Sequence, residues 1–294
     1  MHDISVDHAD HPRPTIALAL GAGGARGLAH IAVLEAFDDL GIKPAMIAGA
    51  SIGAVIGAAY TAGASARQIR SHTERLLRDR STVMTALVEA RIGRLTDLIA
   101  RGNPFLIDAE RFLDRLWPNI MPERFEDLEL PLLAVATDYS ARTEAVFHKG
   151  QLLRAVAGSM AIPGLVKPVR HGGHLLVDGG AVNPLPFDHL IGRADLLVAV
   201  DVTGGPSPQP THASGGFATM FGTLQIMQGA IVAAKLKLYR PEIVVRPAVD
   251  RFRVLDFFQA HAIFRAAEPT KEGLKREIER HLERSTPLSK EGGG

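Results

Sequence analysis

Short apolar segments alternate with helical patterns over the first third of the chain. Residues 15–20 and 45–50 are uninterrupted apolar runs that are too short for helices, so they predict buried strands. Apolar residues then recur at helical spacing over residues 28–40 and 52–61. A strand–helix–strand–helix order is typical of a parallel sheet covered by helices. The pattern therefore predicts the α/β class, with a mostly parallel central sheet flanked by helices.

The rest of the chain is predicted to add strands and helices to this core. Residues 65–120 show a mostly helical pattern, whereas residues 131–137 and 196–202 are short apolar runs typical of buried strands. Gly172 and Gly173 indicate the turn of a hairpin over residues 166–177. We further expect helices at 152–158, 217–238 and 260–284, a strand at 242–246 and a flexible loop at 204–216.

No linker and no shift of composition divides the chain into two domains. We expect a mobile leader over residues 1–14, one folded domain over residues 15–284 and a flexible tail over residues 285–294. The leader lacks a basic region followed by an apolar stretch, so it is not typical of a secretory signal. The cytoplasm is therefore the expected location.

Composition excludes several classes of protein. Of the 294 residues, 46% are hydrophobic and 22% are charged, which is typical of a soluble globular protein. The net charge of +1 gives no sign of nucleic-acid binding. The absence of cysteine excludes disulfides, thiolate catalysis and cysteine-based metal sites. No metal-ligand pattern is apparent, and no cofactor is predicted.

Residues 217–234 carry no charge and raise the question of a membrane span. A spanning helix needs about 20 predominantly apolar residues. Glutamine, threonine and glycine interrupt this segment, and Lys235 follows it directly, so a buried or interfacial helix is the expected structure. The face that this helix is expected to turn toward the core comprises Met220, Leu224, Met227 and Ile231.

Ser51 stands in the pattern G-x-S-x-G, between Gly49 and Gly53. It directly follows one predicted strand and directly precedes one predicted helix, which is the context of a nucleophile elbow. Glycines on both sides allow the backbone of so tight a turn to approach its neighbours. A strand–helix crossing built from small residues would show the same letters, so the pattern alone leaves that alternative open.

The glycine-rich stretch GAGGARG, residues 21–27, lies at the end of the first predicted strand. Successive N–H groups in such a loop can converge on an anion. A dinucleotide site is disfavoured because Arg26 stands where the third glycine of G-x-G-x-x-G belongs, and no acidic residue ends the second strand. We therefore predict an oxyanion hole, with Arg26 either steadying the loop or binding an anionic group of the substrate.

The sequence does not identify directly the base that would accept the proton of Ser51. In a Ser–His–Asp triad on a parallel sheet of this kind, an acidic residue and then a histidine should follow the serine along the chain. Asp178 is the stronger candidate, because it ends a predicted strand and is followed by Gly179, Gly180 and prolines, and a partly desolvated carboxylate can itself act as base. An ordinary turn is the alternative. The later histidines, none in a convincing setting, are His171, His174, His189, His212 and His261.

Taken in order, GAGGARG, GASIG and DGG followed by NPLP resemble the patatin-like phospholipase family, over residues 15–202. The resemblance implies a Ser51–Asp178 dyad without histidine and the hydrolysis of acyl esters, often of phospholipids or lysophospholipids. Residues 159–164 resemble a family segment that packs near the site. Ala22 departs from the pattern, since many members carry glycine there, so the set of oxyanion donors stays open. The implied oxyanion hole lies around Gly23, Gly24 and Ala25, and Arg26 and Gly27 are expected to support the loop or to contact the headgroup.

Three features bear on the substrate and the partners. The arginine-rich stretch over residues 67–101 would attract anionic headgroups, or it is a solvated helix face with interleaved acids. The helix at 217–238 would line an acyl-chain channel if it is not a core helix. Peripheral membrane contact is expected on the same grounds. A thioesterase or general carboxylesterase and a non-catalytic regulator remain the alternatives.

Overall fold

The computed structural model describes residues 14–89, 107–117, 121–205 and 216–285. In this part of the chain the central sheet has the order β5-β6-β3-β2-β1-β7-β8, with β4 beside β3. The strands β3, β2, β1, β7 and β8 are parallel, as predicted for the central sheet. These parallel strands are β1 (Ile16–Leu20), β2 (Met46–Ala50), β3 (Leu132–Asp138), β7 (Leu196–Val200) and β8 (Ile243–Val245).

Antiparallel strands complete one edge of the sheet. β5 (Val169–His171) and β6 (His174–Val177) form the predicted hairpin, and β4 (Thr143–Phe147) runs along β3 from Ala134 to Asp138. Since β4 occupies one side of β3, β2 and β6 share the other side. β6 pairs with Thr137 and Asp138, beyond the part of β3 that pairs with β2. The end of β6 therefore lies next to the carboxyl end of β2.

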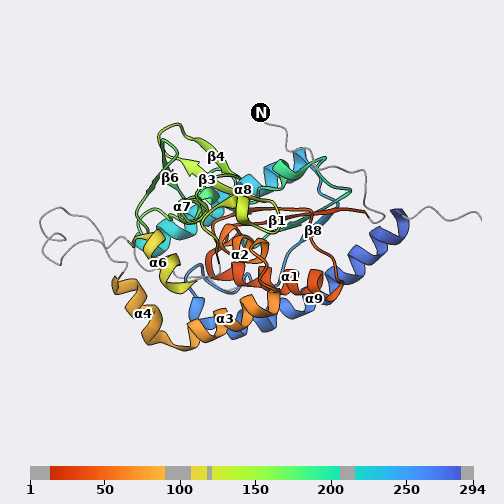
Figure 1. Ribbon diagram of the computed structural model, residues 1–294, viewed down its shortest axis with the longest axis horizontal. Helices are drawn as coiled ribbons and strands as arrows, with labels where there is room; N and C mark the ends of the chain where they lie inside the picture. The colour runs from red at the N-terminus through yellow and green to blue at the C-terminus, as the bar shows by residue number, and fades with distance from the viewer. Residues whose placement is uncertain (1–13, 90–106, 118–120, 206–215, 286–294) are drawn as a thin grey trace, which may run out of the picture.

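Helices cover both faces of the sheet (Figure 1). Side chains of β1 alternate between the two faces: Ile16 and Leu18 pack with α1, α2 and α9, whereas Ala17 and Ala19 face the segment around Phe187 and α8. The helices are α1 (His30–Asp39), α2 (Ile52–Thr61), α3 (Ala66–Arg78), α4 (Arg80–Glu89), α6 (Ala109–Leu116), α7 (Leu152–Ser159), α8 (Gly216–Leu238) and α9 (Ala260–Ser285).

The structure confirms the α/β class, and most predicted elements agree with it to within a residue or two. Two differences matter. The helix expected from residue 28 is preceded by a 3-10 helix, η2 (Gly24–Ala29), that contains most of the glycine loop. β4 was not predicted, because its edge position leaves Thr143 and Glu144 exposed and removes the apolar pattern of a buried strand.

The core-facing side predicted for α8 is wrong. Met220 and Met227 are 45% and 55% exposed, whereas Phe221, Gln228 and Val232 are buried. The helix packs on the sheet through its C-terminal half, where Val232 belongs to the buried cluster. Its N-terminal half instead extends over the end of the sheet, where Phe221 and Gln228 help to close a pocket.

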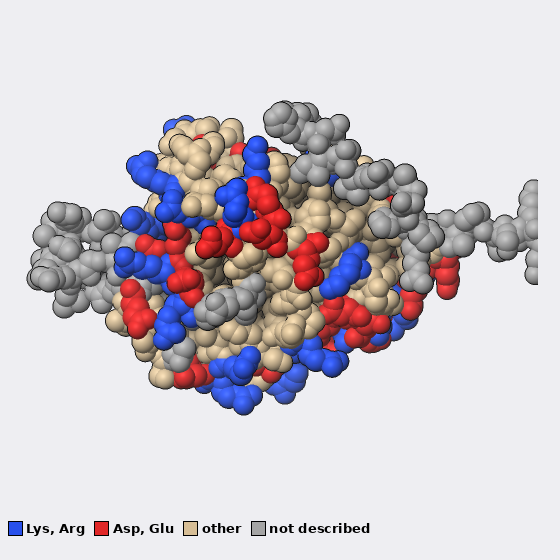
Figure 2. Space-filling model, in the orientation of Figure 1, with Lys and Arg blue, Asp and Glu red and all other residues tan. Residues whose placement is uncertain are grey.

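Charged side chains of both signs are interspersed over the molecular face shown in Figure 2. On α3, Arg70 donates to both carboxylate oxygens of Glu35 at 2.5 Å. Both side chains are largely buried, so this ion pair joins α3 to α1, and Arg70 is neither a solvated side chain nor free to bind a headgroup. The predicted features that fall wholly or mostly outside the described residues are the leader, the tail, most of the loop at 204–216, and Arg91, Arg94 and Arg101. None of the described helices combines the length and apolarity needed to cross a bilayer.

Candidate active site

Ser51 occupies a sharp turn between β2 and α2. Its φ of 54° and ψ of −123° are rare for a residue with a side chain, and such strain costs on the order of 1–3 kcal/mol. The two glycines make the turn possible: a Cβ on Gly49 would lie 2.6 Å from the Ala54 nitrogen, and one on Gly53 would overlap the Leu20 carbonyl oxygen. The turn places Ser51 at the N-terminus of α2, where the helix dipole favours negative charge.

Asp178 lies within hydrogen-bond distance of Ser51, although 127 residues separate them. Ser51 Oγ donates to Asp178 Oδ2 at 2.5 Å. The other carboxylate oxygen, Oδ1, accepts from the Gly180 N–H at 2.8 Å, and the Thr137 hydroxyl donates to the Asp178 carbonyl oxygen at 2.8 Å. A Cβ on Gly179 would overlap the Val135 carbonyl oxygen, so the turn packs closely on β3. The carboxylate is therefore held firmly in one orientation.

Burial makes Asp178 a better proton acceptor than an ordinary aspartate. Its side chain is 3% exposed, and this desolvation raises its pKa to about 6. The hydrogen bonds from Ser51 and Gly180 act in the opposite direction, because they stabilise the carboxylate. A base with a pKa near the working pH is suited to accept a proton and to return it.

Ser159, at the end of α7, holds the backbone of the nucleophile turn. Its fully buried Oγ accepts from the Ser51 N–H at 2.8 Å and donates to the Val135 carbonyl oxygen at 2.6 Å. The segment 159–164 thus lies beside the site, as the resemblance implied. The sequence analysis did not predict that the Ser159 hydroxyl would bind the backbone at Ser51. A lone serine after a short helix carries no sequence signal for such a bond.

The glycine loop offers free N–H groups beside Ser51. Gly23 and Gly24 line the same pocket as Ser51, and neither N–H has a hydrogen-bond partner among the described residues. The Ala25 N–H, by contrast, donates to the Val254 carbonyl oxygen at 2.7 Å. The proposed oxyanion donors are therefore Gly23 and Gly24.

Two glycines of the loop are required by its backbone and its packing. Gly24 has a φ of +57°, and a Cβ there would overlap the Val254 carbonyl oxygen, so a larger residue would be both strained and crowded. A Cβ on Gly27 would overlap the side chain of Ile52, the residue that follows Ser51. The glycine loop and the turn at Ser51 thus touch directly.

Arg26 lies beneath the loop rather than in the pocket. Its side chain is 4% exposed, and its guanidinium contacts the backbone at Gly204. Burial lowers its pKa, while Asp250 and Asp201 raise it. Of the two roles proposed for Arg26, this position favours support of the loop over contact with a headgroup.

The pocket that contains Ser51 and Asp178 is narrow and is closed on one side by α8. Ser51, Asp178, Gly23 and Gly24 form its polar end, and the space inside is about 20 Å³. A larger apolar groove of about 600 Å³ adjoins it and is open to solvent. Phe221 and Leu224 line both spaces, and the other groove residues are Pro163, Thr219, Met220, Thr223 and Met227.

No histidine lies among the described residues that line the pocket. His174, on the hairpin, contacts Asp138 with 2.5 Å between Nδ1 and Oδ2, and His189 contacts Glu144 at 2.9 Å. His171 and His261 also lie outside the pocket, and His212 lies outside the described residues. The geometry thus favours Asp178 as the base.

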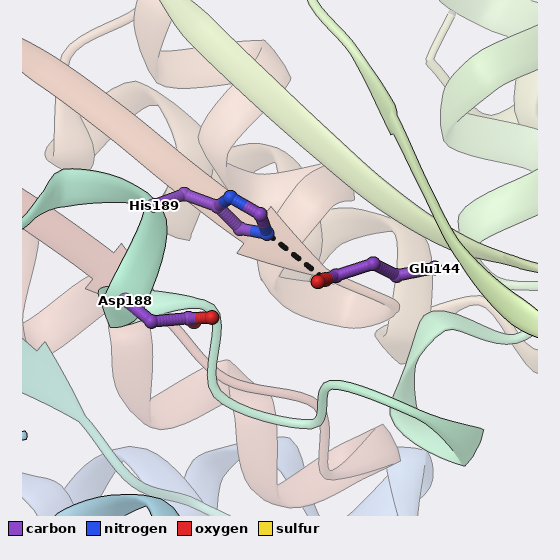
Figure 3. Close-up of side chains that lie close together, drawn as sticks. All are labelled: Glu144, Asp188 and His189. Atoms are coloured by element: carbon purple, nitrogen blue, oxygen red, sulfur yellow. Dashed lines mark hydrogen bonds and ion pairs between the residues drawn. The ribbon is translucent and has the colours of Figure 1, made fainter. Parts of the chain in front are cut away.

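Glu144, Asp188 and His189 form a second polar cluster (Figure 3), and none of the three lines the pocket that contains Ser51. Ligand atoms of Glu144, Asp188 and His189 lie within 4.8 Å of one another, close enough to share a metal ion. These groups are already engaged, however: Lys235 forms an ion pair with Asp188, and Asn183 Nδ2 donates to both carboxylates. The cluster therefore ties α8 to the chain that follows Asp178.

Comparison with known proteins gives consistent matches. The family model described as patatin-like phospholipase matches residues 18–191. An uncharacterized NTE family protein of Mycobacterium tuberculosis is 39% identical over 194 residues, covering 65% of this chain and 50% of that protein. The human patatin-like phospholipase domain-containing protein 6 is 37% identical over 195 residues, covering 64% of this chain and 13% of that protein. The chain thus spans half or less of these relatives.

Solved structures also match. VipD from Legionella pneumophila aligns with 90% of this chain and 67% of its own, at a TM-score of 0.49 and 14% sequence identity.

Proposed function

Because the chain belongs to the patatin-like phospholipase family, whose members are carboxylic ester hydrolases, we propose that it cleaves fatty-acyl esters of phospholipids or lysophospholipids through Ser51 and Asp178. The observation that carries this proposal is the 2.5 Å hydrogen bond between Ser51 Oγ and a buried Asp178 carboxylate. The pocket that contains this pair is also lined by Gly23 and Gly24, whose N–H groups are unpaired, and an apolar groove adjoins it.

The first half of the reaction forms an acyl-enzyme. Ser51 Oγ attacks the carbonyl carbon of the ester, and its proton passes to Asp178 Oδ2. The carbonyl oxygen becomes an oxyanion that accepts hydrogen bonds from the Gly23 and Gly24 N–H groups. When the intermediate collapses, Asp178 returns the proton to the leaving alcohol oxygen, and the acyl group stays on Ser51.

The second half releases the fatty acid. Water approaches the acyl-enzyme beside Asp178, which accepts a proton from it as the new carbon–oxygen bond forms. A second oxyanion intermediate uses the same backbone donors. Its collapse breaks the bond to Ser51 Oγ, and Asp178 hands the proton back to Ser51.

The apolar groove supports an acyl substrate with a long chain. Its walls include Pro163, Met220 and Met227, and methionine adapts to flexible apolar chains. Met220 and Met227 are also half-exposed on a helix whose first 18 residues after Gly216 carry no charge. This face is suited to contact a lipid surface, which would bring the groove to its substrate.

A substrate panel tests the proposed function. We expect fatty acid to be released from phospholipid vesicles or lysophospholipid micelles at least about tenfold faster, in kcat/KM, than from an acyl thioester of the same chain length, because the proposed lipid contact of α8 would bring the groove to a lipid surface. Faster cleavage of the thioester would support the alternative hydrolase instead. No cleavage and no fluorophosphonate labelling would support the non-catalytic alternative.

The pH dependence of ester cleavage follows from the raised pKa of Asp178. Below about pH 6 the carboxyl group is protonated and cannot accept the Ser51 proton, whereas above it the carboxylate is free. We therefore expect kcat/KM to fall about tenfold per pH unit below about 6 and to level off above about 7. Circular dichroism at each pH would check that the protein stays folded. A flat profile between about pH 5 and 8 would exclude Asp178 as the base.

A further inference from the structure

The side-chain nitrogen of Gln225 is a buried hydrogen-bond donor in the pocket that contains Ser51. It lies on α8 and lines the pocket together with Ser51, Gly23 and Gly24. Its Nε2 is buried and has no hydrogen-bond partner among the described residues. Leaving a buried donor unpaired is unfavourable, so such a group in a native structure calls for a partner that is absent here.

The chemistry of the pocket indicates what that partner is. Among the described residues, the backbone N–H groups of Gly23 and Gly24 and the Gln225 Nε2 are unpaired donors of this pocket, and Gln228 adds a further amide to its lining. The Asp178 carboxylate oxygens already accept from Ser51 and Gly180. The carbonyl oxygen of an ester is an acceptor without hydrogens of its own, so it can accept from these three unpaired donors.

The pocket is small. Its volume of about 20 Å³ has room for one water-sized group, and Gln225, Gly23 and Gly24 all line it. The acyl chain attached to that carbonyl leaves toward the groove, past Phe221 and Leu224. A single ester substrate would therefore place its carbonyl oxygen in the pocket and its acyl chain in the groove.

We propose that Gln225 Nε2 donates a hydrogen bond to the ester carbonyl oxygen and serves as a third oxyanion donor beside Gly23 and Gly24. The inference rests on the proposed hydrolase function. In this proposal, α8 binds the ester carbonyl oxygen through Gln225 and also closes one side of the pocket. Unlike the two backbone donors, this donor belongs to a side chain on a separate element and is removed by a single substitution.

The test compares Gln225→Met with Ile226→Met, using a short-chain p-nitrophenyl ester and its thiono counterpart, in which sulfur replaces the carbonyl oxygen. Methionine keeps the length of the side chain but removes the donor. We expect Gln225→Met to lower kcat/KM on the oxygen ester by about 10- to 100-fold, the range for a hydrogen bond to a charged acceptor. Ile226 is 74% exposed, so Ile226→Met should stay within about twofold of wild type.

The thiono ester separates hydrogen bonding from packing. Sulfur is a weak acceptor, so the wild-type enzyme should strongly prefer the oxygen ester. Gln225→Met should reduce that preference about tenfold, whereas a packing defect would slow both substrates equally. Full activity of Gln225→Met, or an equal loss on both esters, would overturn the role of Gln225. The proposed function itself would fail only if the wild-type enzyme cleaved neither these esters nor the phospholipids of the substrate panel, so the two failures are distinguishable.

A second variant keeps the test valid if methionine disturbs α8. Gln225→Glu preserves size and polarity but places an acceptor where the oxyanion forms. It should lose more activity than Gln225→Met, and its melting temperature should stay close to that of wild type. A Glu variant as active as wild type would contradict the proposal.

Discussion

Ser51→Ala is expected to lower kcat for ester hydrolysis by at least about 10⁴-fold, because none of the other described residues that line the pocket carries a hydroxyl or another nucleophile that could replace it. The fold should be retained. Alanine adopts the same backbone angles as serine at no greater cost, and only the Oγ–Asp178 hydrogen bond is lost. Turnover of a p-nitrophenyl ester measures the rate, and thermal unfolding checks the fold.

Covalent labelling identifies the nucleophile independently of any substrate. A fluorophosphonate should label the wild-type chain on the peptide that contains Ser51 and should fail to label Ser51→Ala. Ser140→Ala is a matched control, because Ser140 is an exposed serine on the turn after β3. It should retain full activity and full labelling. Undiminished turnover in Ser51→Ala would remove the basis of the proposed function.

Asp178→Asn is expected to lower kcat by about 10⁴-fold or more, because asparagine cannot accept the proton of Ser51. Its side chain has the shape of aspartate, so its oxygen can still accept from the Gly180 N–H. Stability at pH 8 should not fall. Burial disfavours the charged carboxylate, as its raised pKa indicates, but does not penalise a neutral amide in the same way.

Asp138→Asn and His174→Ala are the matched controls for this variant. Asp138 and His174 form an acid–histidine pair at 2.5 Å, as a triad would require, but neither lines the pocket that contains Ser51. Both variants should therefore keep most of the activity. Combining Ser51→Ala with Asp178→Asn should cost little more than the worse single change, because the two groups act as one unit. A His174→Ala variant as inactive as Ser51→Ala would favour a triad over the dyad.

The sequence determined the local elements of this fold. β1 and β2 are buried on both faces and therefore appear as uninterrupted apolar runs, and α2 begins and ends at the residues predicted for it. Local chemistry also identified the turn at Ser51, because only the spacing of Gly49 and Gly53 permits so close a backbone approach. These features depend on neighbours in the chain, which a pattern can show. Together with the family resemblance, they were sufficient to single out Ser51 and Asp178.

Only the tertiary structure decided which distant groups meet. Ser51 and Asp178 come together because β6 joins β3 beyond the part that pairs with β2, and that pairing depends on long-range hydrogen bonds. The bond from the Ser51 N–H to Ser159 and the engagement of the Ala25 N–H by Val254 arise in the same way. The side of α8 that is buried could also not be predicted from the sequence. Its buried side is set by the end of the sheet that it covers, so Gln225 faces the pocket while Met220 and Met227 border the open groove.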